Sequence, residues 1–97
     1  VRTPDYLARN PNALVPLLED GDYTLWESNV IVRYLCARHS AGQLYPHDLR
    51  ARFDAERWMD WQQTTLNRAS GPAFVQWVRT PVERRDHTAI AASTRAT

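Results

Sequence analysis

The sequence predicts an α/β region followed by an all-helical region. Two short apolar segments, residues 14–18 and 23–26, flank the pair Asp20-Gly21, and such a pair signals the tight turn of an antiparallel hairpin. From Asp48 onward, apolar and aromatic residues recur at helical spacing instead. The change of pattern near residue 44 indicates two partial domains, which explain the chain better than one complete domain.

We therefore place a domain boundary between residues 1–42 and residues 43–97. A two-stranded hairpin leaves both of its edges open and buries one face, so the sheet of the first region needs further strands. The chain also begins at Val1 rather than Met, with a helix-start signal close behind it. We expect the chain to be a fragment of a longer protein.

Composition is typical of a globular protein. Apolar residues make up 43% of the 97 residues, and the net charge of +1 gives no electrostatic argument for binding nucleic acid or an anionic membrane. No apolar run approaches the roughly 20 residues of a membrane span. The single cysteine, Cys36, cannot form an internal disulfide, and this fits a reducing cytoplasm.

The first predicted element is a short helix. Thr3 can cap it, and Pro4 fits the first turn, where the missing N–H costs nothing. The helix runs through about Ala8 and ends near Asn10, because Pro11 disfavours the α conformation for the residue before it.

A second helix is predicted from Ser28, after the hairpin. Its apolar residues recur at one face, which we expect to pack against the hairpin: Val30, Ile31, Tyr34 and Leu35. Gly42 marks the end of this region, and residues 43–47 form a linker.

The second region is predicted to be helical from its N-cap, Asp48, to about Val78. Gly71-Pro72 should break or kink this helix, because the proline ring clashes with the preceding turn. Another helix should start at Thr80-Pro81, and residues 86–97 are only weakly patterned. Four large residues lie on or near one side of the long helix: Phe53, Trp58, Trp61 and Leu66.

Two positions near the hairpin permit both a structural and a functional interpretation. Val15-Pro16 is either a proline tolerated at the start of a strand or a cis peptide bond at a functional turn. Ser28 is either an ordinary N-cap or part of an anion site, because a helix N-terminus presents unsatisfied N–H groups and a partial positive charge.

The combination of these features carries a resemblance. With Val15-Pro16, the Asp20-Gly21 hairpin and Glu27-Ser28 in succession, residues 10–35 resemble the second half of the glutathione-binding domain of cytosolic glutathione S-transferases. The run from Thr64 through Pro81 resembles a bacterial subgroup of these enzymes. The resemblance implies a partial thioredoxin-like fold with a cis bond before Pro16.

The resemblance also implies a glutathione site. The backbone of Val15 would pair with the cysteinyl backbone of glutathione, with Pro16 forming the bend. Ser28 would bind the γ-glutamyl carboxylate, and Glu27 the γ-glutamyl ammonium. Leu14 departs from the Lys or Gln of many relatives, so the glycyl carboxylate is either held by a residue outside the chain or bound more weakly.

The family's activity is the addition of the glutathione thiol to electrophilic small molecules, by a cytoplasmic protein that is usually a homodimer. The thiol-activating Tyr, Ser or Cys would lie upstream of Val1, so no catalytic residue is expected in this chain. We expect the 97 residues alone to be inactive. The alternatives are a non-catalytic, transferase-like protein-interaction module and a truncated gene product without function.

The cysteine and the histidines of the sequence are not expected to form a catalytic or metal-binding site. Cys36 lies in mid-helix, with nothing to activate its thiol. His39, His47 and His87 lack ligand spacing, so no metal site is expected. The segment 57–62 resembles the start of the first long helix of the family's C-terminal domain, and we expect its two tryptophans to pack in the core between the domains. Gln62, Gln63 and Thr64 follow, in a portion of this helix that often lines the electrophile pocket or faces the partner subunit in the family.

Overall fold

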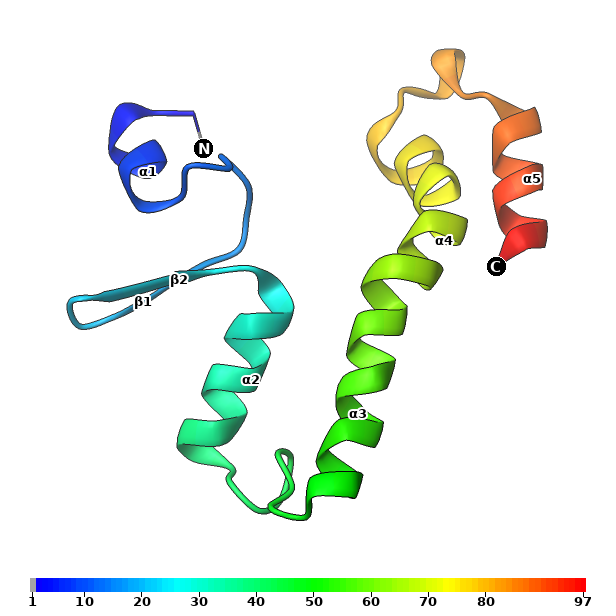
Figure 1. Cartoon of the computed structure of the whole chain (residues 1–97). Coiled ribbons are helices and arrows are strands. Elements are labelled where there is room, and N and C mark those ends of the chain that lie inside the picture. Colours follow the sequence, from blue (N-terminus) through cyan, green and yellow to red (C-terminus); the bar gives the residue numbers. More distant parts are fainter. Residues whose placement is uncertain (1) are drawn as a thin grey trace. The chain divides into compact units, whose positions relative to one another are not determined.

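The computed structural model describes residues 2–97, which form two compact units. The first unit extends to Arg52 and contains a short helix, the hairpin and helix α2; the second extends from Phe53 to Thr97 and is helical. Figure 1 shows this order of elements along the chain. None of the described helices combines the length and the apolar character that crossing a membrane would require.

Helix α1, Pro4–Arg9, begins and ends as predicted to within one residue. The Oγ1 atom of Thr3 accepts a hydrogen bond from the N–H of Tyr6 at 3.2 Å, and Pro4 occupies the first turn. Asn10 is the C-cap, and its N–H donates to the carbonyl of Tyr6. Local sequence signals at both ends are therefore enough to define this helix.

The predicted antiparallel hairpin is present, with different bounds. Strand β1 is Leu17–Asp20 and strand β2 is Tyr23–Trp26, so the strand predicted at 14–18 begins three residues later and ends two residues later. Asp20 pairs with Tyr23, which leaves Gly21-Asp22 as the turn. Gly21 has a φ of +63° at the first central position, where type II′ hairpin turns take glycine.

Helix α2, Ser28–His39, packs on the hairpin through part of the predicted face. Ile31 is buried, and the hydroxyl of Tyr34 donates to Asp20 Oδ2 at 2.5 Å, while Arg38 forms an ion pair with the same carboxylate. Val30 and Leu35 keep 39% and 38% of their surface exposed. The predicted packing is thus confirmed for two of the four residues.

The segment after α2 is closed tightly around Gly42. The N–H of Gly42 donates to the carbonyl of Tyr45 at 2.9 Å, and the glycine has a φ of +84°. A Cβ atom there would lie 2.9 Å from the ring of His47. Arg52 places its guanidinium over the ring of Tyr45 and donates to the carbonyl of Pro46 at 2.9 Å.

A long helical segment follows, formed by α3, Leu49–Trp61, and α4, Asn67–Phe74. Asp48 accepts a hydrogen bond from the N–H of Ala51 at 2.9 Å, which confirms it as the capping residue. Turns of π-helix, Gln62–Leu66 and Val75–Arg79, lie on either side of α4.

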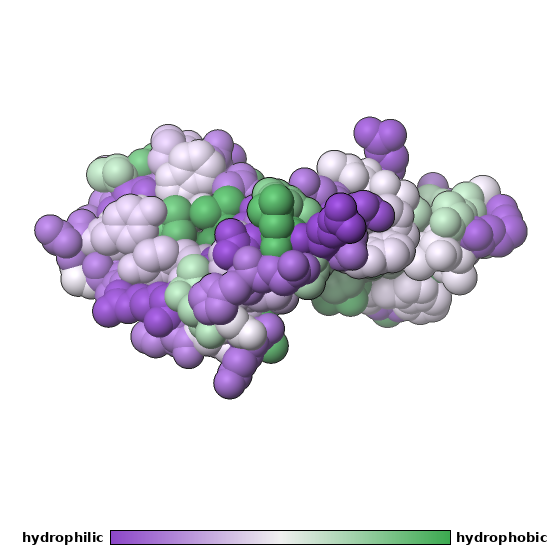
Figure 2. Space-filling view, turned by 60° about the horizontal axis from the view of Figure 1, so that its bottom comes forward, coloured by the Kyte–Doolittle hydropathy of each residue, from purple (hydrophilic) through white to green (hydrophobic). Residues whose placement is uncertain are grey.

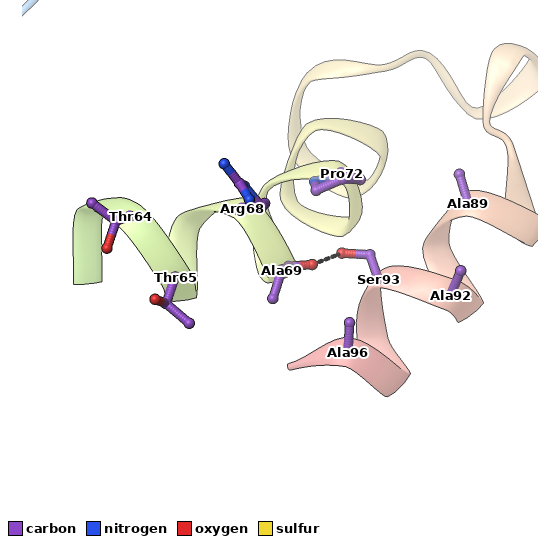
Figure 3. Close-up of a pocket in the computed structure, with 9 residues that line it drawn as sticks. All are labelled: Thr64, Thr65, Arg68, Ala69, Pro72, Ala89, Ala92, Ser93 and Ala96. Carbon is purple, nitrogen blue, oxygen red and sulfur yellow. Dashed lines mark hydrogen bonds between the residues drawn. The ribbon is translucent and has the colours of Figure 1, made fainter. Parts of the chain in front are cut away.

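Of the break or kink predicted at Gly71-Pro72, the break is not found, since Pro72 lies inside α4, and the kink stays a prediction. The hydroxyl of Ser93 explains how the helix continues. It donates to the carbonyl of Ala69 (Figure 3) and accepts from the N–H of Ala73 at 3.1 Å. In a regular helix these two backbone groups would bond each other, so the serine bridges the ladder beside the proline.

Helix α5, His87–Ala96, corrects the description of residues 86–97 as weakly patterned. The Oδ1 atom of Asp86 accepts from the N–H of Ala89 at 3.0 Å, and Ile90 and Ser93 are buried three residues apart on one side. The helix predicted from Thr80-Pro81 is only the 3₁₀ turn Val82–Arg84. A good N-cap and two buried positions thus define a helix that the apolar pattern alone did not reveal.

Much apolar surface stays uncovered. The buried apolar residues among residues 2–97 are Ala13, Ile31 and Ile90, whereas Leu44 is 73% and Val82 69% exposed. Apolar (green) side chains lie open between hydrophilic (purple) ones on the face in Figure 2. Exposure on this scale favours self-association of the isolated chain.

Candidate functional site

Asn10 organises the loop that leads into β1. The side chain is only 2% exposed, and it donates from Nδ2 to the carbonyl of Leu14 at 2.8 Å while Oδ1 accepts from the N–H of Asn12 at 3.0 Å. The carbonyl of Asn10 also accepts from the N–H of Ala13 at 3.0 Å. The amide therefore closes the loop with a donor and an acceptor that no apolar residue could supply.

At the end of this loop the Leu14 carbonyl is hydrogen-bonded to the protein, whereas the side chains of Leu14 and Val15 face solvent. The Leu14 carbonyl accepts a second hydrogen bond, from the hydroxyl of Tyr6 at 2.5 Å. The Leu14 and Val15 residues are nevertheless 65% and 70% exposed. The peptide bond between Val15 and Pro16 is cis, as predicted. Within residues 2–97, no hydrogen bond reaches the N–H or C=O of Val15.

The register of the hairpin brings the predicted site residues to one end. Leu17 and Trp26 form the last pair, so Pro16 and Glu27 are the next residues on their respective strands. The chain therefore enters β1 and leaves β2 at the same end, opposite the turn, as Figure 1 shows for this unit. Val15 and Ser28 flank that end.

Ser28 is the first residue of α2, and its N-cap is Glu27. The interpretation of Ser28 as the N-cap is therefore wrong. The carbonyl of Glu27 accepts the first intrahelical bond, from the N–H of Ile31 at 2.9 Å, and its dihedrals of φ 78° and ψ 110° are non-helical. A cap residue has both properties.

The backbone of Glu27 is strained. A positive φ is uncommon for a residue other than glycine, asparagine or aspartate, and it costs of order 1–3 kcal/mol. Nothing in the sequence signals it, because glutamate is not a residue that favours this conformation. Such strain tends to be kept at binding sites.

The start of α2 is electrostatically suited to a carboxylate. Its first turn contains no acidic residue, and the N–H groups at a helix N-terminus carry a partial positive charge. The exposed carboxylate of Glu27 lies next to it and suits a cation. One end of the hairpin thus combines an open peptide edge, a helix N-terminus and one negative side chain.

Arg9 fixes helix α1 to the hairpin. Its guanidinium forms ion pairs with Glu19 on β1 and with Asp5, the latter at 2.6 Å. The hydrogen bond to Glu19 and the charge of Asp5 raise the pKa of Arg9.

The remaining candidates form no second cluster of chemistry. Cys36 is half-buried in mid-α2, and the described residues hold no group of three His, Cys, Asp or Glu side chains that could bind a metal. Trp58 and Trp61 contact each other edge to face, with ring centroids 5.3 Å apart, and both keep much exposed area. A shallow pocket between α4 and α5 (Figure 3) is lined mainly by small residues, with Arg68 as its charged group.

Comparison with known proteins identifies the family. Residues 1–37 match the model "Glutathione S-transferase, N-terminal domain". Over 91 residues, which are 92% of this chain, the sequence is 50% identical to glutathione S-transferase GstB of Escherichia coli K12. The chain belongs to the glutathione S-transferase family. It spans 44% of the length of GstB, less than half of that relative.

A solved transferase structure confirms the fold. The theta class glutathione S-transferase of Xanthomonas axonopodis pv. citri, in a crystal structure with glutathione bound, matches with a TM-score of 0.91 and 47% identity over 98% of this chain and 46% of that one. The predicted partial thioredoxin-like domain followed by helices is therefore correct. Elongation factor 1-gamma 1 of Oryza sativa subsp. japonica is 37% identical over 70 residues, which are 72% of this chain and 17% of that protein.

Sequence reasoning identified four residues that this chain brings to one end of the hairpin: Val15, Pro16, Glu27 and Ser28. It missed Tyr6 and Asn10, which support them through the Leu14 carbonyl. The only available signal was an Asn before Pro11 at the end of a helix, and it was interpreted as a helix stop.

Proposed function

We propose that Val15, Pro16, Glu27 and Ser28 form the γ-glutamyl and cysteinyl half of a glutathione site. The protein to which they belong would conjugate the glutathione thiol to electrophilic small molecules. The observation that carries this proposal is the meeting of the exposed Val15 peptide and the start of α2 at one end of the hairpin.

Each part of the ligand has a matching group. The Val15 backbone offers a peptide N–H and C=O, which suit the cysteinyl backbone as an added strand would. The N-terminus of α2, with the hydroxyl of Ser28, suits the γ-glutamyl carboxylate. The exposed carboxylate of Glu27 suits the neighbouring ammonium.

Thiol activation is not assigned to this chain. Cys36 is its one thiol, and it lies in the middle of α2 rather than at the end of the hairpin where the proposed site is. We propose that the 97 residues bind glutathione weakly and do not conjugate it alone. The family relation supports a cytoplasmic homodimer as the working form, with glutathione and small electrophiles as its partners.

Calorimetric titration with reduced glutathione tests the site. Ser28→Ala should weaken binding by roughly 1.5–3 kcal/mol, because a hydrogen bond to a charged carboxylate is lost. Its unfolding free energy should fall by less than the binding free energy does, since Glu27 rather than Ser28 is the N-cap. Ser40→Ala at the other end of α2 is the matched control, and equal affinity of the two variants would count against the site.

A second candidate is a non-catalytic protein-interaction module. Its support is the identity of 37% to elongation factor 1-gamma 1 over 72% of this chain. A cooperative unfolding transition without glutathione binding in the titration would favour it over the transferase. Absence of any cooperative transition would favour the third possibility, a truncated product without function.

A further inference from the structure

We infer that Tyr6 and Asn10 are positioning residues for glutathione, acting through the peptide between Leu14 and Val15; the inference rests on the proposed function. Both side chains donate to the Leu14 carbonyl, Tyr6 at 2.5 Å and Asn10 at 2.8 Å. A carbonyl oxygen has two lone pairs, and both are used here. The orientation of this carbonyl is therefore fixed from helix α1 and its C-cap.

Fixing the carbonyl also fixes the N–H of Val15. The two groups belong to one planar peptide unit, and in a trans peptide they point in opposite directions. The cis bond among the described residues follows Val15, so the Leu14–Val15 peptide is trans. With the Leu14 oxygen held by Tyr6 and Asn10, the Val15 N–H points away from them.

Side-chain packing does not fix the orientation of the Leu14–Val15 peptide. Leu14 and Val15 are 65% and 70% exposed, so few neighbours restrain either residue. Asn10 is 2% exposed and Ala13 7%, so the buried part of the loop lies before the open edge. The edge that would meet the cysteinyl backbone is thus ordered by hydrogen bonds to one carbonyl.

Asn10 also sets the path of the loop. Its Oδ1 atom accepts from the N–H of Asn12, and its carbonyl accepts from the N–H of Ala13. Ala13 has a φ of +55°, in the left-handed region that a non-glycine residue seldom adopts. Asn10 holds this turn closed, and Tyr6 adds the second restraint at its end.

Tyr6→Phe is the decisive variant, because it removes one oxygen and leaves the ring in place. Tyr34→Phe is its matched control: it also loses a hydroxyl that donates at 2.5 Å, to Asp20, away from the Val15 edge. Asn10→Ala removes the second donor. All are made in the 97-residue chain, labelled with ¹⁵N and ¹³C for NMR, and titrated with reduced glutathione.

Two measurements are expected to change together in Tyr6→Phe. Without ligand, the Leu14 carbonyl ¹³C signal should shift and the Val15 amide should show a lower order parameter. With ligand, the Kd for glutathione should rise about three- to tenfold, as expected for one lost hydrogen bond. Tyr34→Phe should match the wild type in both, and Asn10→Ala should change both further.

The outcomes separate the two proposals. If wild type shows no glutathione-dependent shifts, the proposed function fails. If Leu14 and Val15 signals are the same in Tyr6→Phe and Tyr34→Phe, the positioning role is overturned, whether or not glutathione binds. It is also overturned if Tyr6→Phe changes those signals but binds glutathione like wild type. If Asn10→Ala does not fold, the comparison of Tyr6→Phe with Tyr34→Phe still decides whether the positioning role holds.

Discussion

Asn10 in the first unit and Ser93 in the second are the buried polar residues of the described chain, at 2% and 5% exposure. Each uses one side chain to donate to a carbonyl and accept from an N–H of irregular backbone. Ser93 completes the hydrogen bonding of a helix. Asn10 supplies the hydrogen bonds of a loop, and the Val15 residue that follows this loop has no hydrogen bond to its own N–H or C=O within residues 2–97. The two buried polar residues therefore differ in what lies beside them, a helix with its backbone bonded in one case and the exposed Val15 peptide in the other.

Asn10→Ala should produce the largest effect. The change removes two hydrogen bonds and leaves a small cavity, so the first unit should lose about 3 kcal/mol of unfolding free energy. Urea denaturation followed through NMR signals of residues 2–52 measures this loss. Stability within about 0.5 kcal/mol of wild type would show that the loop does not depend on Asn10.

Ser93→Ala should cost less, about 2 kcal/mol, because only one oxygen is removed although two part-buried backbone groups lose a partner. The loss should appear in the signals of residues 53–97. Glutathione affinity should stay unchanged, and a weakened affinity in this variant would break the contrast with Asn10.

Asp86→Ala should have the smallest effect. It removes the N-cap of α5, the helix that carries Ser93, and caps are typically worth about 1 kcal/mol. The helicity measured by circular dichroism and the midpoint of the second unit should both fall slightly. An effect larger than that of Ser93→Ala would mean that the cap, rather than the serine bridge, holds α5 in place.

Sequence signals predicted the features that depend on near neighbours. Thr3, Pro4 and Asp48 define helix starts within a few residues, and Asp20-Gly21 lies at the hairpin turn. The succession from Val15-Pro16 to Glu27-Ser28 was specific enough to indicate the family, because each motif keeps its order and spacing along the chain.

Features that depend on distant partners were not predictable in this way. The bridge from Ser93 reaches a residue 24 positions earlier, so the passage of α4 through Pro72 has no local signal. The late start of β1 follows from the end of β2 at Trp26, the partner of Leu17, because the chain enters α2 directly afterwards and leaves residues 14–16 without a partner strand in the described chain. The φ of Glu27 is imposed by the junction between β2 and α2.

That φ of 78° has a consequence for engineering. Glycine adopts such a conformation without steric cost, so Glu27→Gly should relieve the strain and can raise the melting temperature, offset in part by the greater freedom of glycine in the unfolded chain. The same change deletes the carboxylate proposed to hold the γ-glutamyl ammonium. A selection for thermal stability alone would therefore favour Glu27→Gly, a more stable variant that lacks the carboxylate proposed to bind glutathione.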